Sequence, residues 1–410
     1  MIFADFHIHS KYSKATSKLM DLKNLNLAAQ LKGINLIGTG DFSHPEFFSE
    51  LKENLIEFND GIYVLKNESK TKFILTTEFS LIFEKNKKIR KIHILLFAKN
   101  FEIAELINYE FSKIGNLKAD GRPTFWINAV DFMDKILDID KEIFVVPAHI
   151  WTPWFGIFGS KSGFDTIEEC FEDRSRYIYA LETGLSSDPA MNWRLSKLDK
   201  YTLISNSDSH SLQNIGRENN AFNIDEEKIS YNEIINAIKS KDKKKFLFTV
   251  EVPPEFGKYH YTGHRNCNFS VSPKEAIKLK NICPVCKRQL TIGVEQRVEE
   301  LADRDYGFVP ENAIPFKKII PLNEICEYFK VKKKIKEFIK KFGNELNILL
   351  NVPIDELKKV DENVSYVIDL LRKNKNIVKP GYDGVYGEIN LEMNLEINNK
   401  IKKGQTTLEI

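Results

Sequence analysis

Histidine and acidic side chains recur at a two-residue spacing at two places in the chain. The first ten residues read MIFADFHIHS, and a DSH motif occupies positions 208–210. Side chains alternate between the faces of a strand, so His7 and His9 share one face with Asp5, whereas the residues between them are all apolar. Such pairs, in a chain with only eight histidines, predict metal ligands.

Other histidines and acids lie in or at the ends of apolar runs further along the chain. Imidazoles mixed with carboxylates favour Zn²⁺, Mn²⁺ or Fe, and burying so many ionisable groups without a cation would be prohibitive. We expect two or three catalytic divalent ions (Zn, Mn, Mg or Fe), because the candidates outnumber the ligands of one ion. The candidate ligands are His7, His9, Asp41, Glu78, His93, His149, Asp208 and His210. Glu182 is an alternative, as a carboxylate that orients a ligand histidine, and His44 suits a loop role.

Short apolar, β-branched runs that alternate with helical stretches supply the scaffold. The predicted strands lie in residues 1–9, 34–41, 72–83, 91–98, 142–149, 177–184, 201–210 and 246–252. This rhythm is typical of βα units around a mostly parallel sheet or barrel, whose strand ends converge on one opening. Between the first two strands we predict a helix that Asp21 caps and Gly33 ends.

A second cluster contains cysteine. HRNC at 264–267 and CPVC at 283–286 provide two ligand pairs at the spacing of a structural zinc site. The predicted ligands are His264, Cys267, Cys283 and Cys286, with His260 as the rival histidine. The other cysteines, Cys170 and Cys326, are interpreted as ordinary buried thiols.

The residues after 295 have helical periodicity broken by prolines. Residues 330–341 carry seven lysines and one glutamate. Val331, Ile335, Phe338 and Ile339 recur there at helical spacing, which predicts an amphipathic helix. Its cationic face either contacts phosphates or is simply solvated. We therefore expect a small helical region to follow the zinc module.

Length and composition set limits on the class of protein. The 410 residues are 42% hydrophobic and have a formal charge of +2, so any polyanion must bind local patches. Five cysteines are too few for a disulfide scaffold, which favours a reducing compartment. The N-terminus lacks the pattern of a secretion signal, and no apolar stretch approaches the roughly 18 residues of a membrane span. We expect a cytoplasmic protein without a membrane partner.

Four motifs together resemble the PHP (polymerase and histidinol phosphatase) superfamily: HIHS at 7–10, TGD at 39–41, the Glu78, His93 and His149 group, and DSH at 208–210. The resemblance implies a distorted (βα)7 barrel with a trinuclear metal centre that hydrolyses phosphoesters. One departure is Phe42, which stands where many members have a ligand histidine.

The predicted fold class is therefore α/β, with the barrel followed by a zinc-binding module, a small helical region and a C-terminal segment. The segments are a PHP phosphoesterase domain at 1–252, a zinc-binding module at 253–295, a helical DNA-binding domain at 296–378 and a C-terminal segment at 379–410.

Nearly the whole chain also resembles the endonuclease Q family of PHP-type DNA repair nucleases. The matching stretches are GKYHYTGHRNC from 257, CPVC from 283, RVEELADR from 297, ETGLSSDPAMNWRLSKLD from 182 and PGYDGVYGEI from 380. The resemblance implies an enzyme that nicks DNA on the 5′ side of uracil, hypoxanthine, xanthine and abasic sites. Asp208 is the predicted indispensable carboxylate, and a damaged base is read most easily when flipped out of the stack.

Residues near the predicted metal centre are candidates to contact this DNA. They are Ser186, Ser187, Asp188 and Asn192, the aromatic Trp151, Trp154, Phe155 and Phe158, and the cationic Lys11, Lys14 and Lys18. The terminal Gln405 and Leu408 resemble the start of a motif for docking on the sliding clamp. Two alternatives are a PHP phosphatase acting on a small ester such as histidinol phosphate and an inactive DNA-binding scaffold.

Overall fold

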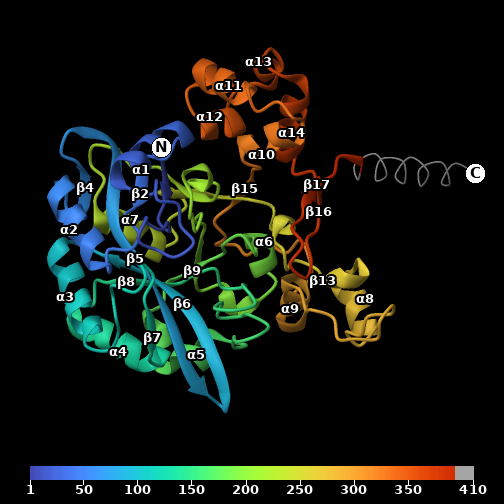
Figure 1. Ribbon diagram of the computed structural model, residues 1–410, viewed down its shortest axis with the longest axis horizontal. Helices are drawn as coiled ribbons and strands as arrows, with labels where there is room; N and C mark the ends of the chain where they lie inside the picture. Colours follow the sequence, from blue (N-terminus) through green and yellow to red (C-terminus); the bar gives the residue numbers. More distant parts are fainter. Residues whose placement is uncertain (393–410) are drawn as a thin grey trace, which may run out of the picture. The chain divides into compact units, whose positions relative to one another are not determined.

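The structure, a computed structural model, describes residues 1–392 (Figure 1). These residues form two compact units, one comprising Met1–Glu251 with Arg297–Lys317 and the other Val252–Gln296 with the chain from Lys318 onward. The predicted clamp-docking residues Gln405 and Leu408 lie outside the described residues. The division into four segments stays a prediction.

Each of the eight runs predicted as strands contains a strand. These strands are β1 (Ile2–Asp5), β2 (Leu36–Gly38), β5 (Glu68–Lys85), β6 (Lys88–Ala98), β8 (Phe144–Pro147), β9 (Ala180–Glu182), β10 (Thr202–Ile204) and β12 (Phe246–Glu251). Five further strands of the first unit were not predicted, because they are short or lack an apolar alternation. They are β3 (Leu55–Asn59), β4 (Ile62–Leu65), β7 (Thr124–Trp126), β11 (Asn219–Phe222) and β15 (Phe316–Lys318).

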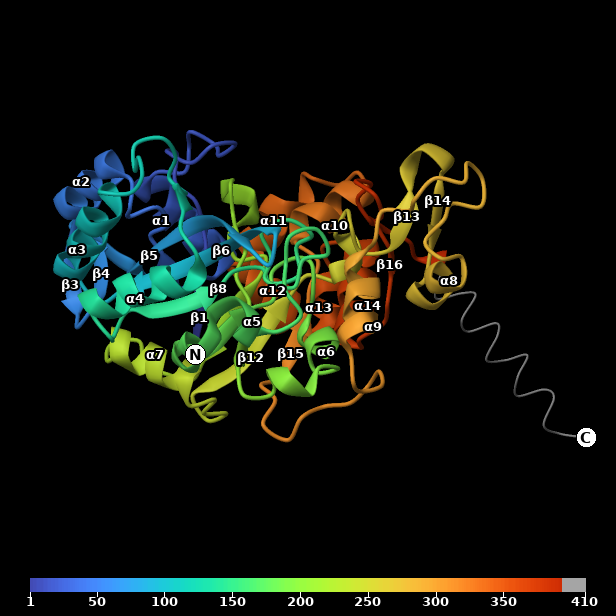
Figure 2. The same cartoon turned by 90° about the horizontal axis from the view of Figure 1, so that it is seen from below.

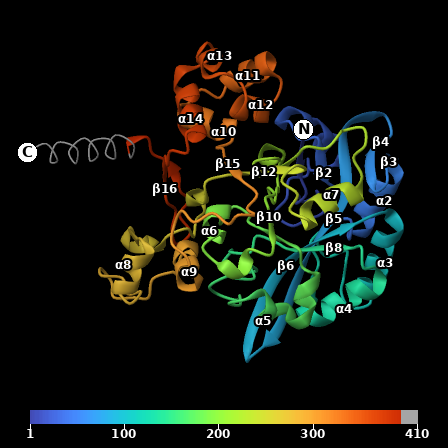
Figure 3. The same ribbon diagram turned by 180° about the vertical axis from the view of Figure 1, so that it is seen from behind.

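The main sheet is mixed, with the path β15-β12-β11-β1-β2-β5-β4-β3 and with β6, β7 and β8 joined through β5 and β6. β1, β2 and β5 run parallel, whereas β11 is antiparallel to β1. The long β5–β6 hairpin is antiparallel and extends from the sheet in Figure 1 and Figure 3. Because β1, β2 and β5 are parallel neighbours, the ends of β1 and β2 lie near the middle of the longer β5.

The strand pairings among residues 1–392 do not close a barrel. β9 and β10 form a separate parallel pair, and buried amide side chains bridge the gap to β1. The Phe6 N–H donates to Asn206 Oδ1 at 2.9 Å, while Asn220 Nδ2 donates to Ala4 O at 3.2 Å and to Ser205 O at 2.7 Å. These amides satisfy backbone groups where a ladder is missing. The mixed α/β class is confirmed, and the closed seven-stranded barrel is not.

Helices cover the sheet of the first unit. They are α1 (Leu22–Lys32), α2 (Pro45–Asn54), α3 (Phe101–Ser112), α4 (Ala129–Ile139), α5 (Ile167–Phe171), α6 (Pro189–Asn192) and α7 (Tyr231–Lys239), and α9 (Val294–Leu301) leads into the returning segment. As predicted, Asp21 caps α1 by accepting from the Asn24 N–H, and Gly33 ends it at a φ of 90°. A left-handed residue at this position suits glycine, which has no Cβ to clash.

The apolar face of β1 lies in the main core. Ile2, Ala4 and Phe6 belong to one buried cluster with Phe97 and Phe222, as the alternation predicted. The Phe6 ring makes an edge contact with Phe97 at 5.3 Å between centroids. Because this face is anchored, the opposite face of the same strand carries the polar side chains in a defined direction.

The second unit contains the cysteine-bearing hairpin and most of the C-terminal helices. The hairpin pairs β13 (Thr262–His264) with β14 (Phe269–Val271) and precedes α8 (Pro273–Lys278). The helices, orange to red in Figure 2, are α10 (Leu322–Tyr328), α11 (Lys334–Phe342), α12 (Glu345–Leu350), α13 (Ile354–Lys358) and α14 (Glu362–Arg372). A short pair, β16 (Val378–Lys379) and β17 (Glu388–Ile389), follows them.

Two details refine the expected helical region. The lysine-rich helix begins at Lys334 rather than Lys330, because Lys330 has a φ of 60° and separates α10 from α11. Arg372 of α14 donates to three carbonyls at the end of α12, among them Val352 O at 2.7 Å and Leu349 O at 2.9 Å. These hydrogen bonds join α14 to the end of α12, next to the predicted proline turn. No helix within residues 1–392 has the length and apolarity needed to cross a membrane.

Candidate metal centre

The two histidines after β1 are held by buried carboxylates on their far ring nitrogens. His7 Nδ1 lies 3.0 Å from both oxygens of Glu182, and His9 Nδ1 lies 3.0 Å from Asp41 Oδ1. A carboxylate accepts from Nδ1–H, so Nε2 remains for a ligand. Both Nε2 atoms therefore point to the same place, next to Glu78.

Glu78, in the middle of β5, joins two groups of side chains. Its Oε1 lies 2.8 Å from His93 Nδ1 and 3.1 Å from His149 Nε2. Its Oε2 lies 3.2 Å from His9 Nε2 and 3.4 Å from His7 Nε2. One carboxylate thus presents a separate oxygen to each pair of imidazoles, an arrangement suited to bridging two cations.

Asp208 completes the first group from the loop after β10. Its Oδ1 lies 3.1 Å from His9 Nε2 and 3.7 Å from His7 Nε2. Its backbone has a φ of 47°, a region that aspartate tolerates better than most residues. His149, at a φ of 29°, belongs to the second group. These sharp turns place both side chains at the ends of their strands.

The residues described form two groups with metal-ligand geometry here, His7 with His9, Glu78 and Asp208, and Glu78 with His93 and His149. The buried atoms His7 Nε2, His9 Nε2 and Asp208 Oδ1 have no hydrogen-bond partner within residues 1–392. Ligand atoms of a tetrahedral zinc ion at about 2.0–2.1 Å lie roughly 3.4 Å apart, close to the separations observed. The donor set therefore fits a divalent cation.

The electrostatics of the site favour bound positive charge. Burial would raise the pKa of Glu78, but the imidazoles of His93 and His7 and the guanidinium of Arg122 hold it well below its usual range. Burial lowers the pKa of His7, yet Glu182 and other carboxylates raise it well above its usual value. A proton must leave an imidazole nitrogen before a metal ion binds there. Metal binding should therefore release protons and weaken as the pH falls.

Two predicted ligands lie outside both groups. Asp41 is turned toward His9 Nδ1, and its Oδ2 accepts from the Ser10 N–H at 2.6 Å and from Ser13 Oγ at 2.8 Å. This geometry favours an orienting role for Asp41, and its predicted role as a metal ligand stays a prediction. The His210 ring packs on His9 with centroids 4.4 Å apart, and its Nδ1 donates to Asp208 O at 3.0 Å.

The contacts of three other residues near the centre show what each side chain does in the fold. Glu182 occupies the orienting position considered for it, on His7. His44 is buried and stacks on Tyr12 with centroids 4.4 Å apart, consistent with a loop role. Phe42 is fully buried, so it contributes to the core.

One functional candidate had no signal in the sequence. Arg122, from the loop before β7, donates through Nη1 to Glu78 Oε2 at 3.2 Å. It lies in a stretch, DGRPTF, that reads as an ordinary turn. Nothing in the local sequence associates it with Glu78, which is 44 residues away.

Several predicted DNA-contacting residues are engaged within the protein. Asn192 accepts from the Trp151 indole N–H at 2.8 Å and donates to Ser187 Oγ and Asp188 O. Asp188 caps α6 by accepting from the Met191 N–H. Trp151 is only 1% exposed, because its ring packs in the core. These bonds explain the residues structurally, and their contribution to substrate binding stays a prediction.

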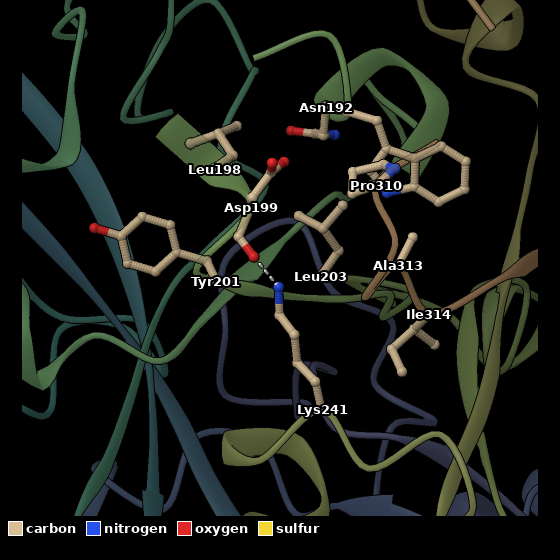
Figure 4. A pocket seen from close by; sticks show the side chains of 10 residues that line it. Asn192, Leu198, Asp199, Tyr201, Leu203, Lys241, Pro310, Ala313 and Ile314 are labelled. Atoms are coloured by element: carbon tan, nitrogen blue, oxygen red, sulfur yellow. Dashed lines mark hydrogen bonds between the residues drawn. The ribbon is translucent and has the colours of Figure 1, made fainter. Parts of the chain in front are cut away.

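Asn192 also lines a small pocket (Figure 4). Its walls are mainly apolar, from residues such as Leu203 and Ile314. The Lys241 ammonium points to the main-chain oxygen of Asp199 and donates to it. Burial lowers the pKa of this lysine. The polar side-chain atoms of Asn192, Asp199 and Lys241 are hydrogen-bonded within the chain, so the pocket offers mostly apolar contact.

Four of the remaining predicted contacts, namely Trp154, Ser186, Lys11 and Lys14, keep exposed surface. Trp154 is 42% exposed, and Ser186 is half-buried beside α6. Lys11 pairs with Glu50 at 2.9 Å, and the Lys14 side chain is largely open to solvent. Phe158 is buried, and Phe155 packs against His93 with centroids 4.4 Å apart.

The second unit gathers the four predicted zinc ligands. His264 Nδ1 lies 3.2 Å from Cys267 Sγ and 3.3 Å from Cys286 Sγ. With Cys283, these residues form a group whose ligand atoms all lie within 4.8 Å of one another. His260 lies outside the group, with its Nε2 3.3 Å from Glu295. The geometry therefore favours His264 over His260 in a closed three-cysteine, one-histidine site.

The surrounding turns and the other cysteines agree with this interpretation. The Cys283 N–H donates to Arg288 O at 2.8 Å, and the Lys287 N–H donates to Cys283 O at 2.9 Å, which forms a tight turn around the CPVC pair. All five cysteines are free, and Cys170 and Cys326 are buried thiols as predicted.

Known proteins resemble the chain over different extents. A family model described as the MJ0043 C-terminal domain matches residues 328–375. The Methanocaldococcus jannaschii protein MJ0043 is 34% identical over 257 residues, which are 59% of this chain. The chain spans only 31% of that relative's length.

Two solved structures match nearly the whole chain. The lesion-specific endonuclease PfuEndoQ from Pyrococcus furiosus is 31% identical, with a TM-score of 0.83 and 95% of each chain covered. An endonuclease Q complex with a 27-mer duplex substrate, which has an abasic lesion at the active site, is also 31% identical. Its TM-score is 0.82, and the match covers 95% of this chain and 96% of that one.

Proposed function

The chain belongs to the endonuclease Q family, and we propose that it is a DNA repair endonuclease. In this proposal it hydrolyses the phosphodiester on the 5′ side of deaminated bases, namely uracil, hypoxanthine and xanthine, and of abasic sites. The observation that carries the proposal is the sharing of Glu78 between two ligand groups, in a chain that matches lesion-specific endonucleases along its length.

His7, His9 and Asp208 would hold one divalent cation, His93 and His149 another, and Glu78 would contact both. Bound cations would supply Lewis-acid stabilisation of the phosphate and a lowered pKa for water. Glu182 and Asp41 keep His7 and His9 in the tautomer with a free Nε2. Asp208 is the indispensable carboxylate, because it lies beside both of these imidazoles at the open side of the site.

We assign roles to the cysteine-bearing hairpin, to the lysines of α11 and to two exposed residues of the first unit from their charge and chemistry. A structural zinc ion on His264, Cys267, Cys283 and Cys286 would order the hairpin of the second unit. The lysines of α11 would follow DNA phosphates. Ser186 and Trp154 keep exposed surface and are our candidates to contact a flipped nucleotide.

The test uses duplex oligonucleotides that contain one abasic site, uracil or inosine, with an undamaged duplex beside them. Mg²⁺, Mn²⁺ and Zn²⁺ are added in parallel, and products are mapped on a denaturing gel. We expect one nick 5′ to the lesion, loss of the nick after chelation, and loss in Asp208→Ala. Asp138→Ala, which removes an exposed carboxylate from α4, should nick normally. Hydrolysis of histidinol phosphate without nicking would instead establish a small-ester phosphatase.

A further inference from the structure

Arg122 brings a guanidinium group into the candidate metal centre. Its Nη1 donates to Glu78 Oε2 at 3.2 Å, and its side chain is 28% exposed. Burial lowers the pKa of Arg122, but the negative charges of Glu78 and, after it, of Asp208 raise it. Arg122 is therefore a partly exposed cation in contact with a carboxylate that belongs to both ligand groups.

The backbone around Arg122 is held firmly. The Gly121 N–H donates to Tyr12 O at 3.2 Å, Ser43 Oγ donates to Gly121 O at 3.1 Å, and the Ser80 N–H donates to Pro123 O at 3.0 Å. Three separate segments thus fix this loop.

At Gly121 the same loop packs closely against side chains that surround His9. A Cβ atom added at Gly121 would lie 2.3 Å from Ser13 Oγ and 2.4 Å from Asp41 Oδ2. Only a residue without a side chain allows this approach. The position of the next residue, Arg122, is therefore determined by the same contacts that orient His9.

The hydrogen-bonding capacity of Arg122 exceeds what Glu78 uses. A guanidinium has five N–H donors, and among residues 1–392 the side chain of Arg122 has one hydrogen bond, through Nη1. Arg217 provides a contrast within the same centre, because its Nε and Nη2 both donate to Ser207 O and hold the loop of Asp208. Arg217 is engaged structurally, whereas Arg122 keeps donors for an anion.

We propose that Arg122 binds a non-bridging oxygen of the scissile phosphate and is a catalytic residue of this centre. Its planar donors match the oxygens of a phosphodiester, and its fixed charge balances the negative charge that grows as a water oxygen bonds to phosphorus and the bond from phosphorus to the leaving ester oxygen breaks. This assignment rests on the proposed function, since it requires a phosphodiester to be the substrate.

The test measures phosphate recognition without cleavage. Two duplexes already nicked 5′ to an abasic-site analogue are compared, one with a terminal phosphate at the break and one with hydroxyl groups only. Fluorescence anisotropy gives the Kd of each for the metal-loaded chain and after chelation. We expect the wild type to prefer the phosphate, and Arg122→Met to reduce this preference about tenfold or more in both conditions. Arg122→Lys should restore part of it, because the charge remains while the planar donors are lost.

Arg176→Met is the matched control, because Arg176 is an exposed arginine whose Nη2 contacts the neighbouring Tyr177 hydroxyl. It should leave the preference unchanged, and the metal content of all variants is measured in parallel. A wild-type preference retained in Arg122→Met would overturn the assignment and leave Arg122 as a counter-ion of Glu78. If the wild type neither nicks lesion duplexes nor distinguishes them from undamaged DNA, the proposed function fails instead.

Discussion

Replacing Asp41 with asparagine should invert the tautomer of His9. Oδ2 of Asp41 accepts from the Ser10 N–H at 2.6 Å, Ser10 Oγ at 2.7 Å and Ser13 Oγ at 2.8 Å. The Ser10 N–H can only donate, so it cannot face an amide NH₂, and the oxygen of the asparagine takes this position. The NH₂ group then faces His9 Nδ1, which lies 3.0 Å from Oδ1 in the native chain. The ring proton must move to Nε2, the nitrogen beside Asp208 and Glu78.

A protonated Nε2 cannot bind a metal ion, so the affinity of the first ligand group should fall. Loss of an orienting partner typically costs 10–100-fold, and we expect about this reduction in Asp41→Asn. Metal affinity is measured by competition with a chelator, and nicking of an abasic duplex is followed against metal concentration. Activity should return at raised metal concentration. Ser13→Ala, which keeps the Asp41–His9 pair, should change the affinity by no more than about threefold.

Two results would refute this reasoning. Wild-type affinity in Asp41→Asn would show that the carboxylate does not set the tautomer. Loss of one bound ion at every metal concentration would show that Asp41 is itself a ligand, as the sequence alone suggested.

Two further changes test other parts of the chain. Burial raises the pKa of Glu251 to about 8; the hydrogen bond from Thr249 opposes this shift and the charge of Asp188 adds to it. The folded chain then keeps a proton that the unfolded chain releases, so this contribution to stability is lost as the pH rises from about 4.5 to about 8. Glu251→Gln should remove this loss and be more stable than the wild type at pH 8.5 by roughly 2–4 kcal/mol in urea unfolding; parallel pH profiles for the two chains would contradict it. Cys283→Ser should release the structural zinc and weaken DNA binding while a generic phosphodiester is still hydrolysed, whereas Cys326→Ser, in the core of α10, should keep the zinc. Equal zinc contents in the wild type and Cys283→Ser would contradict the ligand assignment.

The strands and most of the ligand sets could be predicted because their signals are local. Apolar and polar residues alternate from Ala4 to His9, at the end of β1 and just after it, and this pattern alone places His7 and His9 on one face. The HRNC and CPVC pairs have a spacing that few structures other than a metal site require. β11, with the sequence NNAF, has no such alternation, and its place beside β1 depends on long-range pairing.

Asp41 and Arg122 show where prediction from sequence ends. An acid at a strand end is equally consistent with a ligand and with a partner of a ligand, and the choice depends on which ring nitrogen it meets. Arg122 reaches Glu78 across 44 residues through a loop held by three other segments.

The amino-acid sequence by itself determined which side chains are available for metal and zinc chemistry and which strands carry them, because residue type and period are properties of short segments. Only the tertiary structure decided that Glu78 joins two groups, that Asp41 and Glu182 stand behind the histidines, and that Arg122 lies beside them. These relations are set by distances of about 3 Å between atoms from separate strands and loops, and such distances exist only after the chain has packed.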